Sequence, residues 1–188
     1  MSPALAIGIL AGGRGRRVGD ADKGWLPRGD RAQIQWLLDR LDTGMRVRVV
    51  ANRNLERYRS LVPEVVSDDD AFGPFAGPLG GLLRLLEDMP DSHVLSLPVD
   101  MGSVPAGLCA RFATAVAADP EYCHVAVDAD GPQPLVAAYP RQMARNARAA
   151  LERGCRSVRE WQAGLPVSEL DFRPIRFGNL NTPADWVQ

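Results

Sequence analysis

Short apolar runs alternate along the chain with stretches whose apolar residues recur every three or four positions. The runs predict buried strands at residues 5–9, 46–51, 65–66, 94–97, 123–127 and 135–139. The periodic stretches predict helices at residues 33–41, 54–61, 78–87, 105–118, 141–153 and 157–162. Strands that alternate with helices indicate the α/β class, here a three-layer α/β/α sandwich with a mixed, mostly parallel sheet.

Length and composition favour a single globular domain. No internal repeat, low-complexity tract or linker divides the 188 residues, so we expect one domain over 1–188. Apolar residues at 46% and charged residues at 24% are ordinary values for a globular chain. The net charge of −1 argues against a general nucleic-acid or membrane surface. No apolar run approaches the roughly 18 residues of a membrane span.

Cysteine usage bears on the compartment. Cys109, Cys123 and Cys155 are odd in number and lack the spacing of metal ligands, which predicts reduced thiols and a cytoplasmic location. The N-terminus has no basic segment before its apolar run, so we expect no secretory signal.

The first predicted strand ends in a loop that carries most of the candidate chemistry. Residues 10–24 include five glycines, three arginines and one lysine. Glycines let backbone N–H groups approach a ligand closely, and N–H groups that converge on a concavity bind anions. Guanidinium and ammonium groups add positive charge where phosphate oxygens would lie. The loop therefore predicts a triphosphate site.

The spacing in this loop excludes two common phosphate motifs. A Walker A loop has Ser or Thr after Gly-Lys, whereas Lys23 lies between Asp22 and Gly24. The dinucleotide motif has a third glycine where this chain has Val18. The remaining pattern is Leu-Ala-Gly-Gly at residues 10–13, followed by Arg17, Gly19 and Lys23. It resembles the signature of the molybdenum cofactor guanylyltransferase family, with Val18 in place of the usual Met.

Further polar motifs follow the second and third predicted strands. Asn52 follows the second strand, where the family has an Asn-Arg segment near the nucleotide; alternatively, Asn52 caps the next helix. Three carboxylates at residues 68–70 follow the third strand. Asp70 lies seven residues before Gly77 of a GPLGG turn, which matches the family's base-contacting Asp, and Asp68 is the fallback. A carboxylate can accept from both N1–H and the exocyclic amine of guanine, which favours GTP over CTP.

Asp100 follows the fourth predicted strand. A lone carboxylate at the end of a buried strand is where a hard divalent cation would be held against substrate phosphates. The family resemblance places its metal-binding Asp here, which implies Mg²⁺ as the cofactor. The structural alternative is an N-cap for the following helix.

The resemblance extends to an element near the C-terminus. Asn179 and Asn181 belong to a segment that matches the family's N-x-N-T-P pattern, which lies on the pterin side. Alternatively, Thr182 before Pro183 caps a helix.

The resemblance implies a Rossmann-like nucleotidyltransferase fold and a specific reaction. GMP would pass from GTP to the terminal phosphate of molybdopterin, with release of pyrophosphate. Arg17, Lys23 and Asp100 would be catalytic, and Asp22 would pair with Lys23 or a neighbouring Arg. The expected nucleotide-binding residues are Leu10, Ala11, Gly12, Gly13, Lys23, Asn52, Asp70 and Asp100.

The resemblance also implies partners and leaves rival functions open. Molybdopterin-delivery proteins and acceptor molybdoenzymes are the implied protein partners. One rival is a related nucleotidyltransferase that uses CTP on molybdopterin or acts on a sugar phosphate. The other is a non-catalytic carrier of GTP or pterin, which would lose the metal carboxylate and the catalytic lysine.

Overall fold

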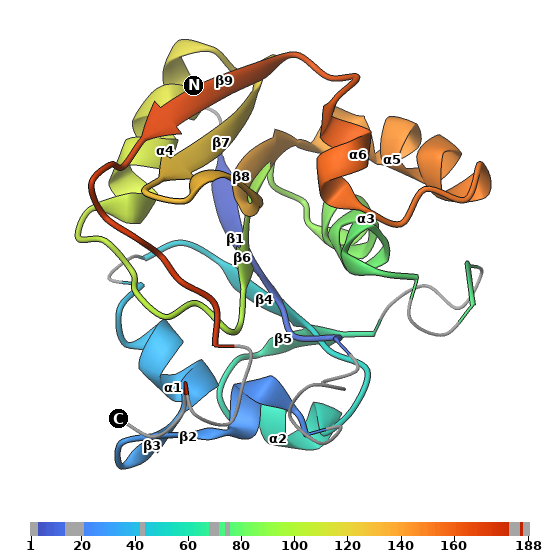
Figure 1. The fold of residues 1–188 in the computed structure, drawn as a ribbon. Coiled ribbons are helices and arrows are strands. Elements are labelled where there is room, and N and C mark those ends of the chain that lie inside the picture. Colours follow the sequence, from blue (N-terminus) through green and yellow to red (C-terminus); the bar gives the residue numbers. More distant parts are fainter. Residues whose placement is uncertain are drawn as a thin grey trace.

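A mixed sheet of seven strands forms the centre of the molecule (Figure 1). The computed structural model describes residues 4–13, 21–41, 44–67, 72–73, 76–180 and 185. The strand order is β5-β4-β1-β6-β8-β7-β9. The bounds are β1 Leu5–Leu10, β4 Val47–Val50, β5 Glu64–Val66, β6 His93–Pro98, β7 Cys123–Asp128, β8 Gly131–Pro140 and β9 Val167–Asp171.

The strand directions confirm a mostly parallel sheet. β5, β4, β1 and β6 run parallel to one another, and β9 runs parallel to β7. Among the described strands of this sheet, only β8 runs antiparallel to both of its neighbours, β6 and β7. Every residue of β6 is buried, as expected for a central strand covered on both faces.

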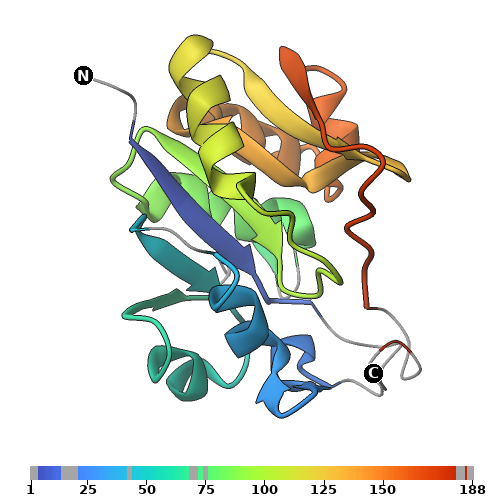
Figure 2. The same ribbon diagram turned by 90° about the vertical axis from the view of Figure 1, so that its left-hand side faces the viewer.

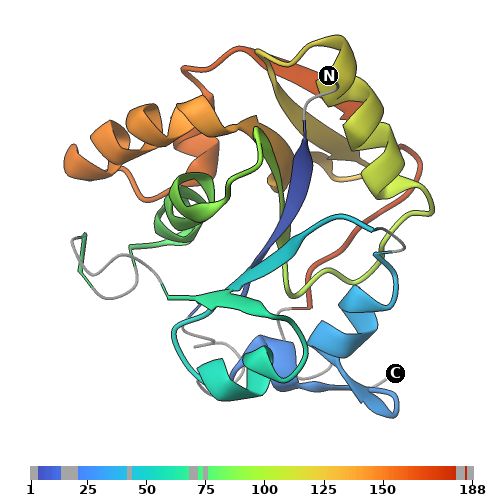
Figure 3. The same cartoon turned by 180° about the vertical axis from the view of Figure 1, so that it is seen from behind.

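Helices cover both faces of the sheet and confirm the three layers. The helices are α1 Gln33–Leu38, α2 Leu55–Arg59, α3 Pro78–Asp88, α4 Leu108–Ala118, α5 Ala144–Glu152 and α6 Val158–Gln162. Figure 2 shows α1 and α4 in front of the sheet, and Figure 3 shows the molecule from behind Figure 1, with α3 and α5 on the opposite side of the sheet from α4. Alternate residues of β1 serve the two cores: Ile7 packs in the cluster with Leu37 of α1, and Ala6 packs in the cluster with Leu82 of α3.

Several predicted bounds differ from the structure. The first helix ends at Leu38 instead of 41, because the amides of Arg40 and Leu41 bond three residues back and tighten the last turn. The fourth begins at Leu108 instead of 105, because Gly107 has a left-handed backbone with φ +73°. The last of the predicted strands, β8, begins at Gly131, four residues before its apolar run at 135.

The sequence pattern missed two features altogether. One is the short hairpin of β2 (Pro27–Arg28) and β3 (Arg31–Ala32), which follows a 3₁₀ turn, η2 (Lys23–Trp25). The other is β9, which is rich in polar residues and pairs only with β7 among the described strands. A second 3₁₀ turn, η4 (Arg141–Met143), replaces the start of the predicted helix at 141. Within the described part of the chain, every helix is too short or too polar to cross a membrane.

Candidate functional site

Three adjacent parallel strands end at one edge of the sheet and bring the predicted motifs together. β4, β1 and β6 end at Val50, Leu10 and Pro98, which share one register. The chain continues across this edge with backbone hydrogen bonds from Ala11 N to Val50 O (2.8 Å) and from Val99 N to Leu10 O (3.1 Å). The loops that follow these strands therefore start side by side, where ligands bind in open α/β sheets.

Lys23 and Asp100 meet at this edge, although they lie 77 positions apart in the sequence. The ammonium Nζ lies 2.6 Å from the carboxylate Oδ2. The two side chains are 21% and 17% exposed, so the pair is partly buried yet open to solvent. Lys23 of η2 and Asp100, which follows β6, thus form one charged centre at this edge of the sheet, the Lys23–Asp100 centre.

Asp22 orients the turn that carries Lys23. Its Oδ1 accepts hydrogen bonds from Gly24 N (3.1 Å) and from the Tyr58 hydroxyl (2.6 Å), and its Oδ2 accepts from Asn54 Nδ2 (2.9 Å). Burial, together with the neighbouring Asp22 carboxylate, raises the pKa of Tyr58 far above its usual value, so the phenol stays a donor. The Lys23 ammonium contacts Asp100, and the arginines of the loop before it lie outside the described residues, so the expected pairing of Asp22 with Lys23 or a neighbouring Arg stays a prediction.

Asn52 connects the loop after β4 with the loop after β1. Its Nδ2 donates to Gly12 O at 3.3 Å, and Arg53 Nη2 donates to Gly13 O at 3.2 Å. The N-cap residue of α2 is Asn54, so Asn52 is not the cap of that helix. The structure therefore places Asn52 beside Gly12, at the start of the predicted phosphate loop.

The C-terminal segment returns to the same edge. Asn179 forms a β-bridge with Met101, and Leu180 N donates to Asp100 O at 2.9 Å. Gly102 N and Ser103 N donate to the carbonyls of Gly178 (3.1 Å) and Phe177 (2.7 Å). Asn179, predicted for the pterin side, thus adjoins the loop that carries Asp100.

Some predicted site residues lie outside the described residues. These are Arg17, Asp70 with its fallback Asp68, and Asn181. Their assigned roles stay predictions.

The sequence pattern missed two polar residues that contact the Asp100 loop. Arg28 of the hairpin and Gln33 at the start of α1 donate hydrogen bonds to main-chain carbonyls of residues 99–102. No sequence motif predicts this contact, because the acceptors are main-chain carbonyls, which every residue has.

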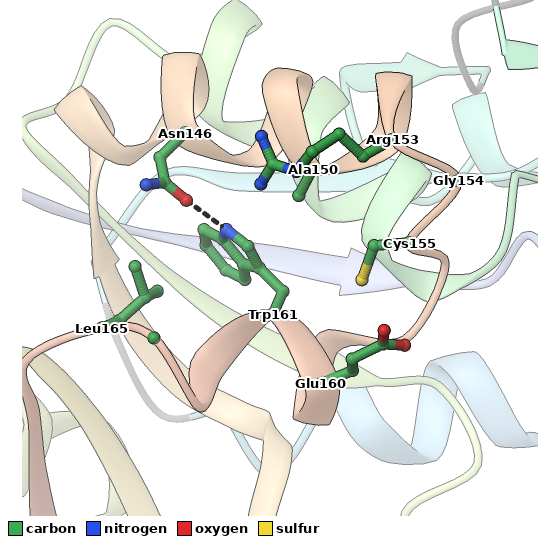
Figure 4. A pocket seen from close by; sticks show the side chains of 9 residues that line it. Asn146, Ala150, Arg153, Gly154, Cys155, Glu160, Trp161 and Leu165 are labelled. Carbon is green, nitrogen blue, oxygen red and sulfur yellow. Dashed lines mark hydrogen bonds between the residues drawn. The ribbon is translucent and has the colours of Figure 1, made fainter.

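A separate pocket lies between α5 and α6 (Figure 4). It has a volume of about 450 Å³ and includes a hydrogen bond of 2.6 Å from Trp161 Nε1 to Asn146 Oδ1. Its lining residues are Asn146, Ala150, Arg153, Gly154, Cys155, Glu160, Trp161, Gly164 and Leu165. None of the predicted site residues lines it, so we do not assign it to the reaction.

Comparison with known proteins agrees with the fold and the motifs. A family model described as a MobA-like NTP transferase domain matches residues 7–167. The molybdenum cofactor guanylyltransferase of Shewanella loihica is 32% identical over 191 residues, which cover 100% of this chain and 96% of the relative.

Solved structures show the same fold. The molybdopterin-guanine dinucleotide biosynthesis protein A from Archaeoglobus fulgidus has a TM-score of 0.80 at 22% identity, covering 96% of this chain and 94% of that one. The inositol-1-phosphate CTP transferase from T. maritima has a TM-score of 0.75 at 14% identity, covering 98% and 92%. Because the second protein's name specifies CTP, the fold alone does not select the nucleotide.

Proposed function

The chain belongs to the MobA-like NTP transferase family, and from this premise we propose that it transfers GMP from GTP to the terminal phosphate of molybdopterin. The products are molybdopterin guanine dinucleotide and pyrophosphate. The observation that carries the proposal is the ion pair between Lys23 of the turn η2 and Asp100, which follows β6 at this edge of the sheet. This pair provides one cation and one carboxylate at the edge where a nucleotide would bind.

The chemistry needs little beyond positioning and charge stabilisation. A terminal phosphate oxygen of the pterin attacks the α-phosphorus of GTP, and the bond from that phosphorus to the bridging oxygen of pyrophosphate breaks. The nucleophile is already anionic, so no general base is required. Lys23 stabilises the charge that develops on the α-phosphoryl oxygens and on pyrophosphate, and Arg17 has the same assigned role. Leu10, Ala11, Gly12 and Gly13 are assigned to the nucleotide, with Gly12 and Gly13 bringing backbone N–H groups to the phosphates, because Ala11 N already donates to Val50 O.

Asp100 fits the requirements of a Mg²⁺ ligand. Mg²⁺ takes one or two protein carboxylates and completes its octahedron with water and phosphate oxygens. Asp100 is a partly exposed carboxylate, and the described residues include no cluster of three or more potential metal ligands. When bound, Mg²⁺ would neutralise charge on the reacting phosphates.

The remaining predicted residues are assigned to one or the other of the two substrates, GTP and molybdopterin. Asn52 and Asp70 belong to the nucleotide side, with Asp70 facing the guanine base. Asn179 and Asn181 belong to the pterin side. The bridge between Asn179 and Met101 supports this division, because it sets the pterin-side segment directly beside Asp100. The cytoplasmic location, the delivery proteins and the acceptor molybdoenzymes stay predictions.

The direct test is an assay for pyrophosphate with purified protein, Mg²⁺, molybdopterin and each of GTP, CTP, ATP and UTP. We expect pyrophosphate only with GTP, and only when molybdopterin is present. Faster turnover with CTP would overturn the assignment of the base. GTP binding without pyrophosphate release would indicate a non-catalytic carrier.

A further inference from the structure

Gln33 is a fully buried polar side chain outside the predicted site, and its amide nitrogen Nε2 donates two hydrogen bonds to the Asp100 loop. Its Nε2 donates to Val99 O at 2.9 Å and to Met101 O at 2.8 Å. These two carbonyls belong to the residues on either side of Asp100. Since a buried carbonyl without a donor costs free energy, Gln33 fixes the backbone on both sides of this carboxylate.

Arg28 extends the same contact along the loop. Its Nη2 donates to Gly102 O at 2.6 Å, and its Nη1 donates to Met101 O and to Gln33 Oε1, each at 3.3 Å. The guanidinium carbon lies 3.7 Å from the centre of the Trp36 ring. This stacking restricts the guanidinium plane, so the two donors reach the loop in a fixed orientation.

The two residues are joined to Lys23 through a short stretch of chain. Lys23 begins η2, Arg28 ends β2, and Gln33 begins α1. The backbone bond from Gln33 N to Leu26 O (3.0 Å) closes this segment on itself. The segment that carries the cation therefore also carries the donors that hold the loop of the carboxylate.

We propose that Arg28 and Gln33 are positioning residues that fix Asp100 relative to Lys23. This inference deepens the proposed function. Only its test by enzyme activity depends on the proposed function. Neither side chain needs to touch substrate, because each acts through carbonyls of residues 99–102. A displacement of about 1 Å at a reacting group costs about 100-fold in rate, so loss of this contact is visible in turnover.

Gln33→Leu is the main variant. Leucine has a side chain of similar size but lacks the amide that donates to Val99 O and Met101 O. We expect kcat to fall about 100-fold, with a smaller change in KM for GTP. In an Asp100→Asn background the same substitution adds little, because the group that it positions is already lost. Equal losses in both backgrounds, or an unchanged kcat, would overturn the proposal.

Gln162→Leu is the matched control. Gln162 is also a buried glutamine, and its Nε2 donates to Pro134 O (3.4 Å) and to the Tyr139 hydroxyl, away from Lys23. The control loses stability and keeps its kcat. If Gln33→Leu does not fold, Arg28→Lys replaces it. Lysine keeps the positive charge but cannot donate to Met101 O and Gly102 O at the same time, as the guanidinium does. We expect kcat to fall about tenfold.

Hydrogen–deuterium exchange provides a readout that needs no substrate. The amides of Gly102 and Ser103 bond to the C-terminal segment, so they exchange slowly while the loop is held. In Gln33→Leu or Arg28→Lys we expect exchange in a peptide covering 99–103 to accelerate about tenfold, with residues 94–97 unchanged. Unchanged exchange at 99–103 would contradict the proposal even if the enzyme turns over, and accelerated exchange supports it even if the assay fails.

Discussion

Lys23 stands out at the residue scale because it is the single lysine among 22 basic residues, the others being arginines. An ammonium is a compact point charge, whereas a guanidinium is a planar fork with five donors. Its ammonium lies 2.6 Å from one oxygen of Asp100. A point charge at this position can turn from the carboxylate to phosphate oxygens without a change of backbone.

Removing either charge is expected to abolish most of the activity. Lys23→Ala and Asp100→Asn lose at least about 100-fold in kcat, because each removes an electrostatic contact made in the transition state. We expect both variants to fold, because the partner left behind in each variant still reaches solvent, at 21% and 17% exposure in the intact pair. Initial rates of pyrophosphate release and thermal unfolding measure the two effects.

Arg31→Ala is the control for this pair of variants. It removes an exposed ion pair between Arg31 and Asp39 and should leave the rate unchanged. Near-wild-type turnover in Lys23→Ala or Asp100→Asn would contradict the mechanism.

Lys23 and Asp100 could be selected from the sequence, because Lys23 completes the glycine-rich motif after the first apolar strand and Asp100 follows the fourth. The same reasoning could not find Arg28 or Gln33. Their partners are carbonyls more than 60 positions away, and a main-chain oxygen leaves no trace in the sequence. The contacts of Asp22 with Tyr58 and Asn54 could not be predicted either, since these residues approach it only in the folded chain.

At the scale of elements, the turn η2 depends on a close contact with α2. A Cβ added at Gly24 would lie 2.2 Å from the Tyr58 hydroxyl and 3.1 Å from its ring carbon Cζ. Gly24→Ala therefore displaces the turn that carries Lys23, and overpacking of this kind costs about 1–3 kcal/mol. We expect a lower free energy of unfolding and a lower rate.

The double variant Gly24→Ala/Tyr58→Phe tests whether this contact is the cause. Phenylalanine removes the oxygen at 2.2 Å but also the donor to Asp22, so Tyr58→Phe alone is destabilising. In urea unfolding, the double variant should lose less stability than the sum of the two single variants. Additive losses would show that the contact does not set the position of the turn.

The apolar pattern predicted the central strands and the longer helices because burial on both sides imposes continuous or periodic apolar runs. It failed where that requirement is absent. The edge strand β9 alternates exposed and half-buried residues and is mostly polar. The hairpin strands β2 and β3 have two residues each, too few to show any period.

At the scale of the molecule, the C-terminal segment links the far side of the sheet to the site. Asp128, at the end of β7, is buried and accepts from Phe177 N at 2.8 Å and from Gln133 Nε2 at 2.8 Å. Burial alone would raise the pKa of Asp128, but hydrogen bonds from Phe177, Gln133 and Asp130 and the charge of Arg176 hold that pKa below its usual value.

A lowered pKa makes this link sensitive to acid. The stability that ionised Asp128 contributes is fully present above the unfolded pKa of about 3.9 and is lost as the pH falls through the lower folded value. Asp128→Asn should cost about 1–3 kcal/mol at pH 7, and the difference from wild type should shrink below about pH 4. Denaturant unfolding of both proteins across this pH range measures the difference in stability. A difference that does not change with pH would show that ionised Asp128 does not stabilise the fold.

The most direct test of the central claim uses the single lysine as a reporter. An amine-reactive reagent labels only Lys23 and the α-amino group, which serves as internal reference in mass spectrometry. GTP with Mg²⁺, at about ten times its Kd, should slow labelling of Lys23 about tenfold relative to that reference, and CTP at the same concentration should not. Unchanged labelling of Lys23 with GTP bound would show that the triphosphate does not lie at the Lys23–Asp100 centre.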